Sequence, residues 1–132
     1  MRKLSAPFLY MACIFMLSSI PGNQMDPENI WEKSLLLITP GLQNLLHIPL
    51  FFGLALTWMY ALSHTKKKPN FKRVAAFIVT VLYSLIDEAH QFYTPGRYAS
   101  LSDILLNSIG AALIFFTPYF FKPSIETKKR SA

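Results

Sequence analysis

Charged residues are scarce in this chain, and their scarcity restricts what the protein can be. Only 15% of its 132 residues are charged, whereas ordinary soluble domains carry about 25%. Apolar residues make up 52% of the chain, and the mean hydropathy is positive. This composition argues against a soluble enzyme and against a disordered tail. The length allows a single domain.

Cysteine and the common catalytic motifs are also nearly absent. The single cysteine, Cys13, cannot form an internal disulfide and offers no cysteine-based zinc site. Its position in an apolar run is typical of a small filler residue in a helix. The chain has no HExxH zinc motif, no nucleophile elbow and no glycine-rich phosphate loop. We therefore expect no cofactor.

The basic residues are distributed in a way that is typical of membrane proteins. Lys and Arg total 13 against 7 Asp and Glu, a formal charge of +6. A nucleic-acid module would gather them on one face or groove, but here they form short clusters between apolar runs. We therefore expect membrane lipids as partners and no nucleic acid.

Four apolar stretches predict four membrane-spanning helices, at about 4–20, 45–63, 74–93 and 100–121. At about 1.5 Å per residue, each is near the length that a hydrocarbon core of about 30 Å requires. The first could also be a secretory signal peptide, but no small-x-small cleavage site precedes Pro21, so we expect a retained helix. The sequence predicts an all-α, integral membrane four-helix bundle, forming one transmembrane domain over 1–132.

The positions of the basic residues predict the orientation of the bundle. If the N-terminus is cytoplasmic, the inner segments hold two basic residues before the first stretch, five between the second and third, and four after the fourth. The outer segments then hold only Lys33 and Arg97. Because cytoplasmic loops are rich in Lys and Arg, both termini should lie inside.

The first outer loop, 21–44, contains a candidate interfacial helix. Asp26-Pro27-Glu28 is typical of a helix start, and Trp31 is suited to the level of the lipid headgroups. A loop packed against the bundle explains the same residues, and the sequence leaves both interpretations open.

The ionisable residues inside the apolar stretches all fall toward the outer side. Charged groups within a bilayer are costly and usually face the bundle interior or a wet cavity, so they are functional candidates. We expect them to converge there, with Arg97 bonded to one of the acids through its planar fork. The candidate ligand-binding residues are His47, Asp87, Glu88, His90, Gln91, Arg97, Ser100, Asp103 and Asn107.

Several of these residues also have purely structural interpretations. Ser100 and Asp103 have the spacing of a helix N-cap and its third residue. Asn107 could bond between helices, and His47 alone is more often a packing residue than a ligand. Gly110 would let another helix approach closely, and Pro95-Gly96 is first of all a turn between antiparallel helices.

The run from Asp87 to Gly110 resembles the signature of VanZ-like membrane proteins. It contains an acid pair, His-Gln, Pro-Gly-Arg, and then Ser, Asp, Asn and Gly, at Asp87-Glu88, His90-Gln91, Pro95-Gly96-Arg97, Ser100, Asp103, Asn107 and Gly110. Ser18-Ser19 resembles the family's serine-rich end of the first helix. A second motif ends at His47, with Gln43-Asn44 where an Asp-Lys pair is common. The resemblance implies a multi-pass protein of the bacterial cytoplasmic membrane, in a family of undefined activity that is named for teicoplanin resistance.

Two hypotheses about function follow from these residues. In the first, the outer polar pocket binds an amphiphilic ligand, such as a lipid-linked cell-wall intermediate or a lipoglycopeptide, with Arg97 holding an anionic group. In the alternative, the protein is a small intramembrane enzyme, with Asp87 or Glu88 as general base and His90 or His47 as acid or base. A metal variant of that enzyme would use His47, His90 and a carboxylate. A proton-coupled transporter is a third possibility, but four short helices form little pathway unless the protein oligomerises.

Overall fold

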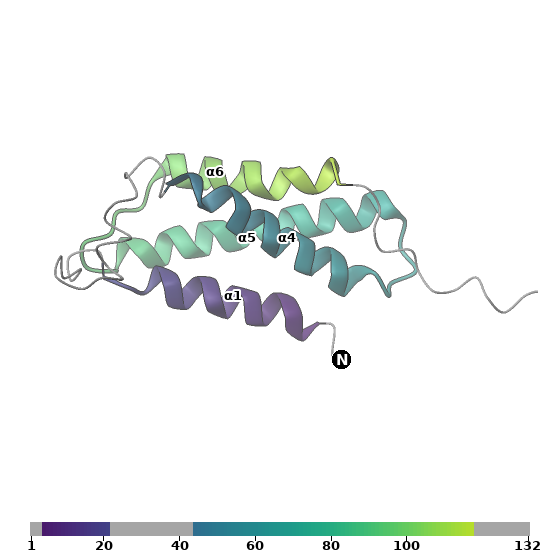
Figure 1. Ribbon diagram of the computed structural model, residues 1–132, viewed down its shortest axis with the longest axis horizontal. Helices are drawn as coiled ribbons and strands as arrows, with labels where there is room; N and C mark the ends of the chain where they lie inside the picture. The colour runs from purple at the N-terminus through teal and green to yellow at the C-terminus, as the bar shows by residue number, and fades with distance from the viewer. Residues whose placement is uncertain (1–3, 22–43, 118–132) are drawn as a thin grey trace, which may run out of the picture.

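The computed structural model describes residues 4–21 and 44–117, and all of the regular structure in these two ranges is helical (Figure 1). Four α-helices follow one another along the chain: α1 (Ser5–Ser18), α4 (His47–Leu62), α5 (Pro69–Phe92) and α6 (Leu101–Ala112). A short 3₁₀ turn, η1 (Leu113–Phe115), extends α6. For the described residues, the prediction of an all-α architecture with four helices is confirmed. The candidate interfacial helix near Asp26 lies outside the described residues.

Helix α5 is longer than its apolar run suggests. It begins at Pro69, five residues before the predicted start at Val74, and Pro69 occupies its first turn. Proline is favoured there because its fixed φ suits a helix and its missing N–H would be unpaired in any case. Lys72 and Arg73, which the sequence places in a loop, therefore belong to the start of this helix.

The helices pack around two small hydrophobic clusters. Helix α6 packs on α4 and α5, and α1 lies along α4 and α5 without contacting α6 in the described part of the chain (Figure 1). One cluster joins α1, α4 and α5, and the other joins α4, α5 and η1. Their buried members are Ile14, Phe51, Leu54 and Tyr83 in the first, and Ala55, Met59, Ala76 and Ile114 in the second.

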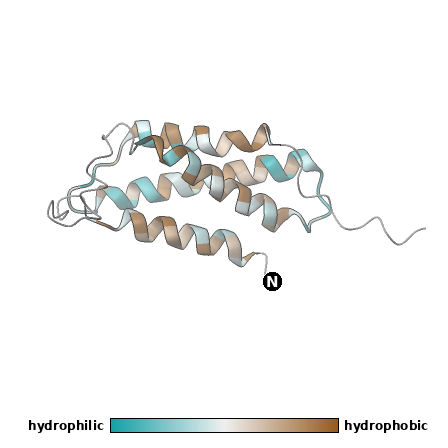
Figure 2. Cartoon of the chain, viewed as in Figure 1, coloured by the Kyte–Doolittle hydropathy of each residue, from teal (hydrophilic) through white to brown (hydrophobic). Residues whose placement is uncertain are grey.

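Helix α5 has its polar residues inside and its apolar residues outside. Its buried face carries Thr80, Ser84 and Gln91 together with both acids, Asp87 and Glu88. Its exposed apolar residues recur mostly every three or four positions, at Val74, Ile78, Leu82, Leu85 and Ile86. A helix on the surface of a water-soluble protein shows the reverse arrangement, so this face is suited to lipid. Figure 2 shows hydrophilic positions gathered toward the two ends of α5.

Among the described residues, α5 is the one helix that is both long and apolar enough to cross a membrane, by length and composition. Helices α1, α4 and the continuous α6–η1 segment are also apolar but have only 10–17 residues. At about 1.5 Å per residue, the 16 residues of α4 extend about 24 Å.

Two glycines occupy positions that other residues would fill only with strain, one in a turn and one at a close contact between helices. Gly96 has a φ of 73° in the turn between α5 and α6, and the Arg97 N–H donates to the Thr94 carbonyl at 3.1 Å. A proline followed by a glycine with positive φ is typical of a type II turn, as the sequence predicts at Pro95-Gly96. A Cβ atom at Gly110 would overlap the Ile48 backbone, so the predicted close approach of another helix at Gly110 is confirmed.

Basic side chains cap the C-terminal ends of three helical segments. The Lys72 Nζ donates to the Ser63 carbonyl after α4 at 3.2 Å, and the Arg73 guanidinium donates to the Thr117 carbonyl after η1 at 2.8 Å. Arg97 donates to carbonyls at the end of α1. The last carbonyls of a helix lack intrahelical partners, and the helix dipole favours positive charge there.

Candidate functional site

The candidate residues form two separate clusters at the end of the bundle that holds the α5–α6 turn. Asp87 and Glu88 are adjacent on α5, so their side chains are rotated by about 100° from each other. Asp87 faces α1, whereas Glu88 faces the start of α6. We call the first group, Ser18, Ser19, Asp87, His90 and Gln91, the α1 cluster. The second group, His47, Ser84, Glu88, Asp103 and Asn107, is the α6 cluster.

In the α1 cluster, both carboxylate oxygens of Asp87 have hydrogen-bond donors. The Ser18 hydroxyl donates to Oδ1 at 2.6 Å, and the Gln91 side-chain amide donates to Oδ2 at 3.1 Å. Asp87 is only 2% exposed. Since Ser18 ends α1 and Asp87 lies in α5, this buried carboxylate joins the two helices.

The hydrogen bonds around His90 define which ring nitrogen carries a proton. The Ser19 hydroxyl donates its only proton to the Phe15 carbonyl at 2.7 Å. Its oxygen therefore accepts from His90 Nε2, which lies 2.9 Å away and must carry a hydrogen. The imidazole also stacks on the Phe15 ring, with centroids 4.3 Å apart. His90 thus contacts α1 through both its edge and its face.

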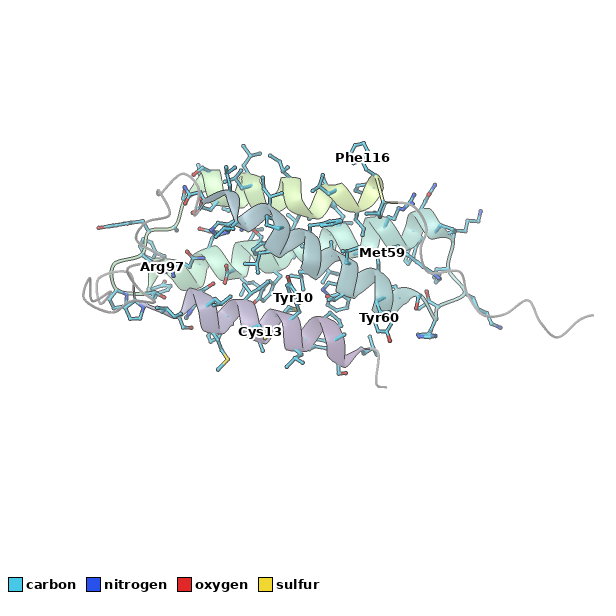
Figure 3. The ribbon with its side chains drawn as sticks, in the orientation of Figure 1. Tyr10, Cys13, Met59, Tyr60, Arg97 and Phe116 are labelled. Carbon is cyan, nitrogen blue, oxygen red and sulfur yellow. The ribbon has the colours of Figure 1, made fainter. Side chains whose placement is uncertain are left out.

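The expectation that Arg97 bonds to one of the acids is wrong for the part of the chain that the structure describes. Its Nε donates to the Ile20 carbonyl at 3.1 Å, and Nη2 approaches the Leu17 carbonyl at 3.4 Å. Figure 3 shows Arg97 beside the end of α1. Both Asp87 oxygens already have donors. The end of α1 offers Arg97 carbonyls that lack the usual intrahelical donor four residues on, together with the negative end of the helix dipole.

In the α6 cluster, Asn107 links three helices. Its amide nitrogen donates to the Ser84 hydroxyl of α5 at 2.9 Å, and its Oδ1 lies 2.9 Å from His47 Nδ1 on α4. An amide oxygen can only accept, so Nδ1 of His47 carries the hydrogen. Nε2 of His47 is then left as an acceptor when the ring is neutral. The interhelical bond foreseen for Asn107 is present.

Glu88 takes over the capping role that the sequence predicts for Asp103. Ser100 is the N-cap residue of α6, but its side chain makes no capping bond and its hydroxyl contacts Ser102 instead. The Ser100 backbone N–H donates to Glu88 Oε2 at 3.1 Å. In a capping box, the acid at the third helical position makes this bond. Here Glu88 of the neighbouring helix α5 accepts the bond from the Ser100 N–H, and Asp103 does not take part in the cap.

Two carboxylate oxygens of the α6 cluster are buried without a hydrogen-bond partner. They are Glu88 Oε1 and Asp103 Oδ1, and the side chains that carry them are 2% and 8% exposed. Both Asp103 and His47 interact electrostatically with Glu88. Nearly all buried polar groups in proteins are paired. The α6 cluster, with two unpaired acceptor oxygens, therefore differs from the α1 cluster, in which both oxygens of Asp87 have donors.

The comparisons with known proteins now identify the family. The model of the VanZ/LLP1 family matches residues 6–122. The chain belongs to the VanZ/LLP1 family. No curated protein and no solved structure was found to match it. The matched range includes both clusters and, apart from Ser5, the four described α-helices. The chain is thus a VanZ-family membrane protein, and α5 is a clear candidate span among the described residues.

Among the described residues of this VanZ-family chain, no group of three His, Cys, Asp or Glu side chains is placed to hold a metal ion. His47 bonds to Asn107 on α6, whereas His90 bonds to Ser19 after α1. The metal variant of the enzyme hypothesis needs these two imidazoles at one ion, and this arrangement does not bring them together.

Sequence reasoning missed Ser84 as a member of the site. Ser84 is fully buried and accepts the Asn107 amide. A signal was available, because Ser84 precedes Glu88 by four residues and so lies on the same face of α5. Tyr83 was missed as well, and its hydroxyl donates to the Met11 carbonyl of α1 at 2.6 Å.

Proposed function

We propose that this VanZ-family protein crosses the bacterial cytoplasmic membrane four times, with both termini in the cytoplasm and both polar clusters in the outer half. The polar clusters and the basic loop between α4 and α5 lie at opposite ends of the bundle (Figure 1). Exposed Tyr93 and Tyr98 lie near the α5–α6 turn, where interfacial aromatic residues are common. The asymmetry of basic residues supports the same orientation.

The proposed topology predicts where reporters will be active. A reporter fused after Ala132, and another inserted in the loop at 65–69, should both behave as cytoplasmic. A reporter inserted after Gly96 should behave as external. An external C-terminus would contradict this topology and would place the polar clusters on the cytoplasmic side.

We further propose that the α6 cluster binds the polar head of an amphiphilic ligand. The observation that carries this proposal is the pair of buried, unpartnered oxygens, Glu88 Oε1 and Asp103 Oδ1. A buried acceptor without a donor costs about 1–3 kcal/mol, and a ligand that donates hydrogen bonds would remove that cost. The α1 cluster contrasts with this, since both oxygens of its acid already have protein donors.

The exposed apolar helices supply the second half of such a site. Large apolar side chains cover the outside of α5 and α6, among them Ile86 and Leu105, and an acyl or prenyl chain could lie along them. A lipid-linked cell-wall intermediate and a lipoglycopeptide both combine such a chain with a head rich in hydroxyl and amino groups. A role in glycopeptide resistance would follow from binding or shielding one of them.

The binding proposal is tested by native mass spectrometry of the full-length protein purified with its bound lipids. The Glu88→Gln and Asp103→Asn proteins should each lose an amphiphile that the wild type retains. Each substitution replaces a carboxylate that has an unpaired acceptor oxygen with an uncharged amide. Ser108→Ala is the matched control on α6, because the Ser108 hydroxyl bonds only to the Ile104 carbonyl of its own helix. Retention of the same amphiphiles by all four proteins would contradict the proposal.

The enzymatic alternative uses the same atoms, with Glu88 as the general base and His47 as its partner in proton transfer. It gives a different result in the same experiment. An enzyme would convert its bound lipid during incubation, and Glu88→Gln would retain the lipid unconverted. If the protein only binds its lipid, the mass of the bound lipid will be unchanged after incubation.

A further inference from the structure

We infer that the acidic pair of the α6 cluster, Glu88 and Asp103, binds a protonated primary amine on the head of an amphiphile. This inference rests on the proposed binding function and names the chemical class of the ligand. It follows from the kinds of polar atoms that remain unpaired in the cluster and from the sign of the charge around them.

All the unpaired positions of the α6 cluster are acceptors. Glu88 Oε1 and Asp103 Oδ1 have no donor, and in the neutral His47 ring Nε2 is an acceptor because Nδ1 carries the hydrogen. Of the donors in the cluster, the Asn107 amide bonds to Ser84 and the Ser100 N–H bonds to Glu88 Oε2. A ligand must therefore bring donors, and a primary ammonium group brings three.

The charge of the cluster favours a cationic head over an anionic one. Glu88 lies near two other acids, Asp103 on α6 and Asp87 on α5, and near the imidazole of His47 on α4. The nearby arginine, Arg97, donates to the end of α1. Two carboxylates held close in a medium of low dielectric repel each other, and an ammonium group relieves that repulsion. A phosphate would add negative charge beside two acids.

The test uses the full-length protein in phosphatidylcholine nanodiscs, with decylamine as the probe and the thermal unfolding midpoint as the readout. Decylamine should raise the midpoint in a saturable way. Glu88→Gln and Asp103→Asn should each weaken its apparent affinity roughly tenfold to a hundredfold, as expected for loss of a charge-assisted hydrogen bond. Asp103→Asn leaves the Ser100–Glu88 contact intact, so it serves as the second variant if Glu88→Gln fails to fold.

Matched probes separate the ammonium group from general detergent effects. Decyltrimethylammonium has the same charge but no N–H donor, and it should bind at least about tenfold more weakly to the wild type. Decyl phosphate should give no saturable shift. Ser108→Ala should respond to decylamine as the wild type does, because its hydroxyl bonds within α6.

Two sources of the amine are distinguished by changing the bilayer. If the natural ligand is a phospholipid headgroup, nanodiscs of phosphatidylethanolamine will compete with decylamine and weaken its apparent affinity. If it is the amine of a lipid-linked sugar or peptide, the two bilayers will give the same affinity. Both results support an amine site.

Other outcomes would overturn the inference. Glu88-dependent binding of decyl phosphate or decyl glucoside, without binding of decylamine, would show a ligand site with another specificity. The proposed binding function would then stand and the amine inference would fall. If Glu88→Gln and Asp103→Asn both bind every probe as the wild type does, both proposals fall.

Discussion

Replacing Asp87 with alanine should destabilise the protein by about 3 kcal/mol or more. The substitution removes the acceptor for two buried donors, the Ser18 hydroxyl and the Gln91 amide. Leaving a buried donor without an acceptor typically costs about 1–3 kcal/mol, and here two donors lose their acceptor. The free energy of unfolding in a mixed-micelle denaturant titration measures this effect.

A double-mutant cycle isolates the contact between α1 and α5. Ser18→Ala, Asp87→Ala and the double variant should give a coupling energy of about 1.5–3 kcal/mol, the usual contribution of a hydrogen bond to a charged group. Thr57→Val is the control, because the Thr57 hydroxyl bonds to the Leu54 carbonyl within α4. Additive effects of Ser18→Ala and Asp87→Ala would show that the two side chains do not act together.

Gly110→Ala should destabilise the bundle by about 2 kcal/mol or more, although alanine is the better helix former by about 1 kcal/mol. A Cβ atom at position 110 would overlap the Ile48 carbonyl, which is backbone and cannot rotate away. Overpacking of this kind usually costs about 1–3 kcal/mol. Helices α4 and α6 would move apart, and the bond between His47 and Asn107 would lengthen.

Gly53→Ala provides the matched control for this prediction. A Cβ atom at Gly53 would also meet a close neighbour, but that neighbour is the end of the Tyr10 side chain, which Figure 3 shows between α1 and α4. The Tyr10 ring can rotate, so Gly53→Ala should cost well under half as much. Equal losses of unfolding free energy would contradict the distinction between backbone and side-chain contact.

The sequence predicts the helices and the end of the bundle where the polar groups gather, because both depend on local patterns. Apolar runs define the helices, the turn chemistry of Pro95-Gly96 makes neighbours of α5 and α6, and that turn places Glu88 beside the start of α6. The spacing of Gly110 predicts a close contact without naming its partner, which is Ile48.

The division into two clusters could not be predicted in the same way. The spacing of Asp87 and Glu88 fixes the angle between their side chains, but it does not determine which helix lies in each direction. That depends on the packing of α1 against α5, through which Asp87 meets Ser18. The same packing places the end of α1 next to Arg97. It thereby changes the expected partner of Arg97 from a carboxylate to backbone carbonyls.

The caps at the basic end of the bundle separate its positive residues into two kinds. Lys66, Lys67 and Lys68 are exposed. In the proposed topology only the number of such residues matters for orientation, so one could be exchanged for another nearby. Lys72 is only 2% exposed and donates to the end of α4, while Arg73 donates after η1. These two act through their positions. Moving a basic residue to a neighbouring position, with the total charge kept, should therefore leave the protein stable at 66–68 but destabilise it at 72–73.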